Sequence, residues 1–250
     1  MFRSIVMISA LLLCSCANEP VQWSPPVQSG APREPGELPG SVRPPSIRGC
    51  GASLRVAESE GSAFAVWWRS RADSSAALLV SHSMHGGPWS APVVADSTDR
   101  SARGCGRPPP AIAADARTGY VHVAYFIEPP NGAGIFFAHS MDSAATFHAP
   151  VPIVFGRNPS RVSVSANGDR VAVAYEDPNS QQPMIGVALS KTMGHLFEAR
   201  VRATSPNGHA RQPVVRIEGD SIRLWWSEYS ANPAVSATRP FYRAALWHDD

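Results

Sequence analysis

Arginine residues recur just before short apolar runs of this 250-residue chain, and acidic residues recur just after the runs that follow. A guanidinium group binds a carboxylate through two parallel hydrogen bonds, and two carboxyl groups can act as acid and base on a sugar linkage. Grouped at one end of a fold, such residues would bind a carboxylated or hydroxyl-rich ligand. The alternative is that the arginines pair with neighbouring acids and brace loops. The candidate ligand-binding residues are Arg48, Arg107, Arg157, Arg211, Glu128, Glu176 and Glu228, with Arg103, Asp177 and Tyr229 beside them.

Other residue patterns indicate no further chemistry. The sequence has no GxSxG, HExxH or phosphate-loop motif. Histidines fall singly in predicted strands (His82, His122 and His139) or turns (His85 and His195), where a packed or surface role is the more common one. We therefore expect no metal and no cofactor, and no residue is assigned as catalytic.

The candidate residues are positioned by a repeating pattern of strands. Alternation with a period of two and terminal aromatic residues favour strands at 63–68, 120–125, 170–175 and 221–226, and helical periodicity is nearly absent. First strands are expected at 53–57, 111–114, 161–165 and 214–217, third strands at 78–81, 135–139, 185–189 and 242–246, and fourth strands from Trp89, Phe147 and Phe197. A repeat of roughly 50 residues is typical of propellers or solenoids.

A short phrase follows three of the third strands, at 83–89, 140–147 and 190–197. Its Ser and Asp side chains can accept hydrogen bonds from the amides of a tight turn, and its aromatic residue begins the next strand. The phrase resembles the Asp-box of the bacterial neuraminidase repeat, S-x-D-x-G-x-T-W/F, from which His85, Ala144 and Thr192 depart. The resemblance implies an all-β, sialidase-type β-propeller of about four blades with four-stranded antiparallel sheets. The Asp-boxes would lie on the face opposite to the candidate ligand-binding residues.

The fourth repeat lacks a last strand, and the N-terminal region contains a match for it. Residues 23–27 (WSPPV) are similar to residues 89–93 (WSAPV). Propellers protect sheet edges by pairing of this kind, so we expect a strand at 22–27 to close the ring. The alternative is that residues 17–47, which are rich in Pro and Gly, are only a tether.

The first 15 residues have the pattern of a lipoprotein signal peptide. Arg3 precedes an apolar stretch at 5–13 that is too short to span a bilayer, and Cys16 ends a phrase that resembles a lipobox. We expect a lipidated Cys16 and, because Ala17 follows it, anchoring in the outer membrane of a bacterial envelope. An ordinary secretory peptide is the alternative. The predicted domains are the signal peptide at 1–15, a connector with the closing strand at 16–47 and the propeller at 48–250.

Cys50 and Cys105 occur in matching Arg-Gly-Cys-Gly phrases. An exported protein is in an oxidising compartment, so we expect a disulfide between them. The formal net charge of +2 and the lack of a basic run argue against nucleic acid as a partner. The expected partners of this monomeric domain are the membrane, through the lipid, and a glycan or an envelope protein.

Three functional hypotheses follow. The first is a non-catalytic sialidase-like propeller that binds a glycan or another carboxylated ligand. The second is a divergent glycoside hydrolase that uses the acids as catalysts. In sialidases an arginine triad holds the sialic acid carboxylate and a Tyr–Glu pair supplies the nucleophile, but no tyrosine of this chain is matched to that role. The third is a periplasmic scaffold for other proteins. Fold alone does not choose among them.

Overall fold

The computed structural model describes residues 20–30, 44–205, 209–229 and 238–248, so Cys16 lies outside the described residues. The described residues form antiparallel β-strands and one short 3-10 helix, η1 (Gly51–Ser53), and none of their helices is long and apolar enough to cross a membrane. The predicted all-β fold of four antiparallel sheets is confirmed: three sheets have four strands, and the fourth has four strands in sequence across the sheet plus the short β2 paired beside them.

Strands that follow one another in the chain build the first three sheets and most of the fourth. The first sheet contains β3 (Arg55–Ser59), β4 (Ser62–Ser70), β5 (Ala76–Ser83) and β6 (Val93–Asp96), and the second contains β7 (Ala111–Ala114), β8 (Val121–Ile127), β9 (Gly134–Ser140) and β10 (Val151–Phe155). The third sheet contains β11 (Val162–Asn167), β12 (Arg170–Glu176), β13 (Ile185–Ser190) and β14 (Ala199–Arg202), and the fourth contains β15 (Ala210–Glu218), β16 (Ser221–Tyr229) and β17 (Thr238–Trp247) with two N-terminal strands.

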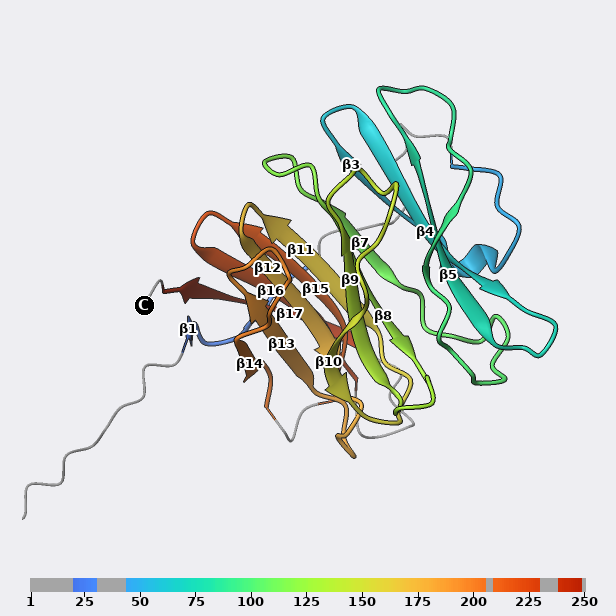
Figure 1. Ribbon diagram of the computed structural model, residues 1–250. Helices are drawn as coiled ribbons and strands as arrows, with labels where there is room; N and C mark the ends of the chain where they lie inside the picture. The colour runs from blue at the N-terminus through green and yellow to red at the C-terminus, as the bar shows by residue number, and fades with distance from the viewer. Residues whose placement is uncertain (1–19, 31–43, 206–208, 230–237, 249–250) are drawn as a thin grey trace, which may run out of the picture.

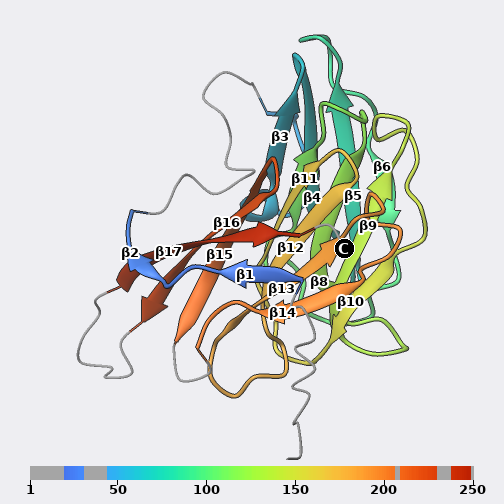
Figure 2. The same ribbon diagram turned by 90° about the vertical axis from the view of Figure 1, so that its left-hand side faces the viewer.

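The N-terminal strands β1 (Val21–Trp23) and β2 (Val27–Gln28) both pair with β17. Figure 2 shows them beside the long β17, where β1 places Val21 opposite Trp247. Pairing stops between the two strands at Pro25 and Pro26. A proline has no N–H for a sheet ladder, which explains the break.

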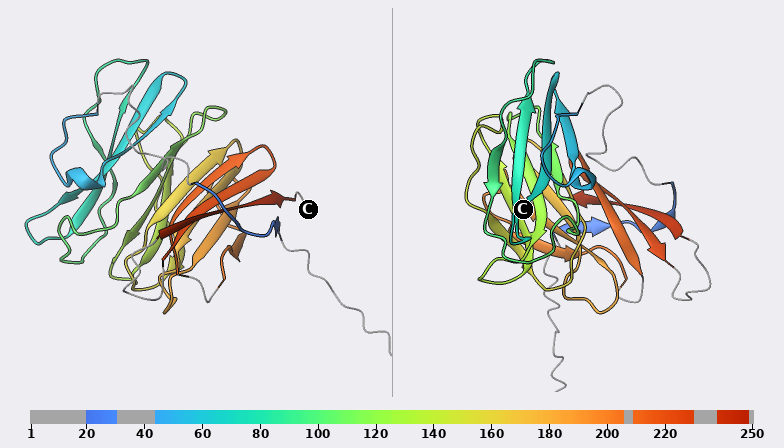
Figure 3. Two further views of the ribbon diagram at one scale, coloured as in Figure 1. Left: turned by 180° about the vertical axis from the view of Figure 1, so that it is seen from behind. Right: turned by 90° about the vertical axis from the view of Figure 1, so that its right-hand side faces the viewer.

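The four sheets lie side by side in chain order (Figures 1 and 3). Their inner strands are neighbours, with β3 against β7, β7 against β11 and β11 against β15. The first and fourth sheets lie at opposite ends of the row. The N-terminal strand therefore completes the fourth sheet, whereas closure of a ring by that strand is not confirmed.

Three buried clusters fill the spaces between neighbouring sheets. Trp68 and Tyr125 meet edge to face, with ring centroids 5.9 Å apart, between the first and second sheets. Phe137 and Phe197 do the same at 5.0 Å between the second and third. The middle strands are buried on both faces, which is why their sequences are almost continuously apolar.

The turn phrases are held by their own side chains. In the second copy the Asp142 carboxylate accepts hydrogen bonds from the Thr146 amide (2.8 Å) and hydroxyl (2.6 Å), and the Ser140 hydroxyl accepts one from the Ala144 amide (2.8 Å). The Thr146 bonds, that of the side chain first, lower the pKa of Asp142 to about 2. These residues stabilise a turn, as their types predict.

The predicted disulfide between Cys50 and Cys105 is present, with a Cα–Cα distance of 5.3 Å. Cys50 lies just before η1, and Cys105 lies in the segment that leads from the first sheet to the second. The bond therefore ties the segment before the first sheet to the start of the second.

Candidate functional site

A cleft of about 740 Å³ lies where the inner strands of the second, third and fourth sheets begin. A narrower hollow next to it is lined by Arg55, Ala111, Val162 and Pro213, one residue from or beside each inner strand. The four inner strands thus share one central space, and the cleft opens beside it. We call it the central cleft. Its polar lining consists of Arg107, Arg161, Glu176, His209, Arg211, Gln212 and Tyr229.

Arg211 is the cleft residue best suited to bind an anion. Its side chain is exposed, and no hydrogen bond or ion pair of that side chain occurs in the described part of the chain. The pairing of β15 with β16 shifts register between Arg211 and Val214, and Gln212 has a φ of +57°. An irregularity of this kind re-aims neighbouring side chains, and left-handed backbone costs a non-glycine residue about 1–2 kcal/mol.

Glu176 holds this irregular backbone in place. One carboxylate oxygen accepts a hydrogen bond from the Gln212 amide at 2.9 Å, and the other accepts one from the Arg161 amide at 3.3 Å. The carboxylate thereby joins the third sheet to the fourth. It is the one acidic side chain among the described residues that line the central cleft.

Arg107 also lines the cleft, but its guanidinium group is committed to the fold. It is 1% exposed and forms an ion pair with Asp99 at 2.5 Å. It also donates to the carbonyl oxygens of Ser101 (2.6 Å), Ser74 (3.2 Å) and Gly104. A buried guanidinium with this many partners braces the loops, which is the alternative role that the sequence left open.

The remaining predicted ligand-binding residues lie outside the lining of the central cleft. Glu128 accepts two hydrogen bonds from Arg103, at 2.5 and 3.1 Å, and this pairing lowers the pKa of Glu128. Glu228 accepts a hydrogen bond from the indole nitrogen of Trp226 at 3.1 Å. Arg48 and Arg157 are exposed. The structure thus brings together Arg107, Glu176 and Arg211 out of the seven predicted residues.

Three polar residues of the cleft are not among the residues that the sequence suggests: Arg161, His209 and Gln212. Tyr229, which the sequence places beside the candidate Glu228, also lines the cleft. Their common signal is position, because each lies within a few residues of the start of a first strand or the end of a second one.

A second hollow, of about 800 Å³, lies against the first sheet. Its lining runs from Pro44 and Ser46 to Glu58, Glu60 and Trp89. The β-strands beside it belong to the first sheet alone, whereas three sheets contribute to the central cleft. We therefore place the candidate site in the central cleft.

No protein-family model and no curated protein matches the chain. Solved structures do. The chain is 18% identical to the Hadza microbial sialidase Hz136 over 76% of its own length (TM-score 0.51) and 17% identical to an α-L-arabinanase of Penicillium chrysogenum over 80% (TM-score 0.54). It is 9% identical to the NanB sialidase of Streptococcus pneumoniae over 84% (TM-score 0.53).

The chain has a sialidase-like β-propeller fold. At these identities the likeness concerns the fold and not the activity. The chain spans 43%, 64% and 52% of the lengths of these three proteins. Other solved structures that it resembles include the ulvan lyase of a polysaccharide lyase family and an α-L-arabinofuranosidase of Fusarium graminearum. The likeness therefore shows the fold alone, and the residues of the central cleft carry the evidence on function.

Proposed function

We propose that this propeller binds an anionic glycan in the central cleft, with Arg211 as the principal anion-binding residue. The observation that carries the proposal is the exposed Arg211 side chain, presented by an irregular stretch of β15 into a cleft of about 740 Å³. A guanidinium group that is free to make two parallel hydrogen bonds selects planar carboxylates. Gln212, His209 and Tyr229 supply the hydrogen-bonding and ring surfaces that hydroxyl-rich ligands need.

The number of carboxylates in the cleft, and the hydrogen bonds that they already make, favour binding over hydrolysis. Glycoside hydrolysis by the usual route needs two carboxyl groups on either side of the scissile bond. Glu176 is the one carboxylate in the described lining, and both of its oxygens already accept backbone hydrogen bonds. Hydrolysis through Tyr229 and Glu176, in the manner of a sialidase, is the second candidate because the two residues share the cleft with Arg211.

The test is a binding titration with sialylated, uronate-containing and neutral arabino-oligosaccharides. The solved structures that the chain resembles include a sialidase and an arabinanase complexed with arabinobiose, and the uronate probes add a second class of carboxylated sugar. We expect the carboxylated probes to bind, and Arg211→Ala to weaken that binding about 10- to 100-fold, the value of one or two hydrogen bonds to a charged group. Arg48→Ala is the matched control, since Arg48 is also exposed but does not line the cleft.

An equal loss of affinity in Arg211→Ala and Arg48→Ala would mean that only the net charge of the protein matters. Unchanged binding in Arg211→Ala would refute the site. Fluorogenic glycosides provide the second readout. Turnover that is abolished by Tyr229→Phe would assign hydrolysis in place of binding.

We further propose that the chain is anchored through a lipid on Cys16 in the bacterial envelope, with the turn phrases toward the bilayer and the central cleft away from it. Support comes from the short span between Cys16 and β1, whose Val21 pairs with Trp247. Thiol labelling of the anchored protein with single cysteines at Ser143 and Asn131, in a background without Cys50 and Cys105, tests the orientation. Membrane protection of the Asn131 site alone would contradict it.

A further inference from the structure

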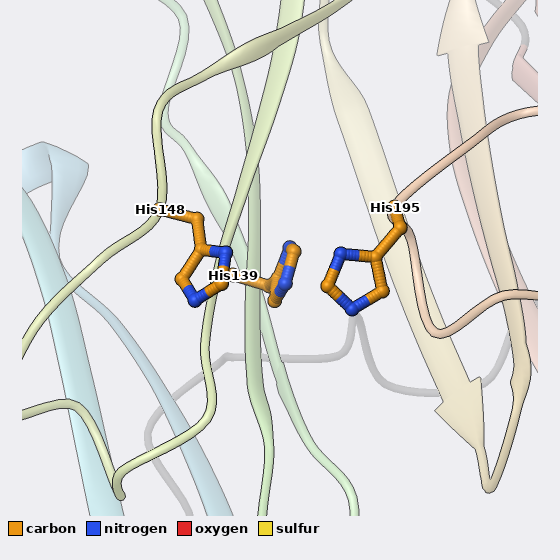
Figure 4. Close-up of side chains that lie close together, drawn as sticks. All are labelled: His139, His148 and His195. Carbon is orange, nitrogen blue, oxygen red and sulfur yellow. The ribbon is translucent and has the colours of Figure 1, made fainter.

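Three histidine side chains gather where the second sheet meets the third. His139 lies near the end of β9, His148 follows the second turn phrase, and His195 lies in the turn after β13. One nitrogen from each ring lies within 4.8 Å of the others. Figure 4 shows the His139 ring between the rings of His148 and His195, with centroid distances of 4.6 and 4.5 Å.

The backbone fixes where these histidines stand. The His148 amide donates to the His139 carbonyl at 2.9 Å, so the two residues are neighbours across the sheet. His195 lies in a turn that is closed by a hydrogen bond from its own amide to the Thr192 carbonyl, at 3.0 Å. The preceding Gly194 lies so close to the Phe137 ring that a Cβ there would be 2.4 Å from it. The turn of the third sheet is thus fitted against the strand that carries His139.

The chemistry of the cluster suits a metal ion. His139 is 2% exposed, and its Nε2 has no hydrogen-bond partner in the described part of the chain. A neutral imidazole nitrogen offers a lone pair, as the imidazole ligands of zinc do.

The His122 ring, across the β8–β9 pair from His139, reinforces this picture. It is fully buried, and neither of its nitrogens has a hydrogen-bond partner among the described residues. A buried polar group without a hydrogen-bond partner is destabilising. His122 and His139 are therefore buried together beside the exposed His148 and His195. Apolar packing does not explain this group of four polar rings.

We propose that His139, His148 and His195 bind one zinc ion between the second and third sheets. Three protein ligands leave a fourth tetrahedral position, which water would occupy because His148 and His195 are exposed. Zinc–nitrogen bonds of about 2.0–2.1 Å place ligand nitrogens about 3.4 Å apart, so the two exposed rings turn inward on binding. The ion would link neighbouring sheets on the side of the turn phrases. Sequence reasoning expected no metal because the three ligands come from separate elements.

The test uses the mature protein without a histidine tag and zinc chloride as the probe. Equilibrium dialysis with metal analysis should find one zinc per chain, and cobalt(II) should give the visible absorption of a tetrahedral site. Saturating zinc, at about 100 times its dissociation constant, should raise the melting temperature by about 5–10 °C.

His148→Gln and His195→Gln change exposed side chains, so both variants should fold. Each should weaken zinc binding at least about tenfold, since even the outer partners of metal ligands contribute that much. His85→Gln is the matched control, because His85 is exposed in the corresponding turn of the first sheet. Absence of zinc binding in the wild type, or binding by both variants equal to that of His85→Gln, would overturn the proposal.

Discussion

The ion pair between Asp99 and Arg107 is the contact whose loss should destabilise this propeller most clearly. Both side chains are at most 2% exposed. Asp99 also accepts hydrogen bonds from the Ala76 amide (3.0 Å) at the start of β5 and from the Glu128 amide (3.1 Å) after β8. One carboxylate therefore joins the first sheet, the second sheet and the segment between them.

The expected magnitude follows from what each substitution leaves behind. Asp99→Ala leaves the buried Arg107 charge without its ion-pair partner and leaves two backbone amides without their hydrogen-bond acceptor. Breaking a buried pair from one side costs about 3–5 kcal/mol. In a domain of this size each kcal/mol lowers the melting temperature by about 2–4 °C, so the loss should be about 6–20 °C. Removing both charges, in Asp99→Leu with Arg107→Met, leaves no buried ion and should cost less than the sum of the two single changes.

Urea unfolding followed by tryptophan fluorescence measures these free energies. The matched control is Arg103→Ala, which breaks a partly exposed pair with Glu128 in the same region and should cost at most about 1 kcal/mol. The reasoning is refuted if Asp99→Ala costs no more than Arg103→Ala, or if the double change costs the sum of the single ones.

Three further outcomes are expected. Reduction of the disulfide, which closes a loop of 55 residues, should lower the free energy of unfolding by about 4 kcal/mol, measured with and without reductant. Gly194→Ala should cost about 2–5 kcal/mol, because φ is +87° and the new Cβ meets the Phe137 ring; Gly219→Ala, at φ +56° with open space around it, should cost about 1 kcal/mol. The Thr146 hydrogen bonds lower the pKa of Asp142 from 3.8 to about 2, so its stabilisation is complete above about pH 4 and is lost as the pH falls through about 2. The difference in urea midpoint between wild type and Asp142→Asn should follow that course, and a difference that persists below pH 2 would contradict the assignment.

Strands were predictable because burial on both faces leaves a strong local pattern. Predicted runs at 120–125 and 170–175 fall within or next to β8 and β12. The first strand of the fourth sheet was less predictable, since 214–217 was expected and β15 spans Ala210–Glu218. The first residues of β15 depend on Glu176 of the third sheet, whose carboxylate accepts a hydrogen bond from the Gln212 amide. No local pattern contains that contact.

The candidate site was predictable by position and not by orientation. The repeat places each arginine at a known end of its sheet, and this was enough to find Arg211 and Glu176. It could not say that Arg107 turns toward Asp99, because the acid comes from a segment between the sheets that the pattern leaves unassigned. The histidine cluster was not predictable for a related reason, since its members share no short spacing.

The distribution of strong contacts follows from the open row of sheets. The fourth sheet packs against one neighbouring sheet only, and its β16 is accordingly less buried than the middle strands β8 and β12. The first sheet has a second buried cluster on its other face, and the disulfide and the Asp99–Arg107 pair hold its junction with the second sheet. The fourth sheet gains the N-terminal strand, where Arg243 stacks over Trp23 at 5.0 Å. Gln212 belongs to β15 of this fourth sheet, and its irregular backbone is held by the Glu176 carboxylate of the third sheet, so the packing of these two sheets sets the shape of the central cleft.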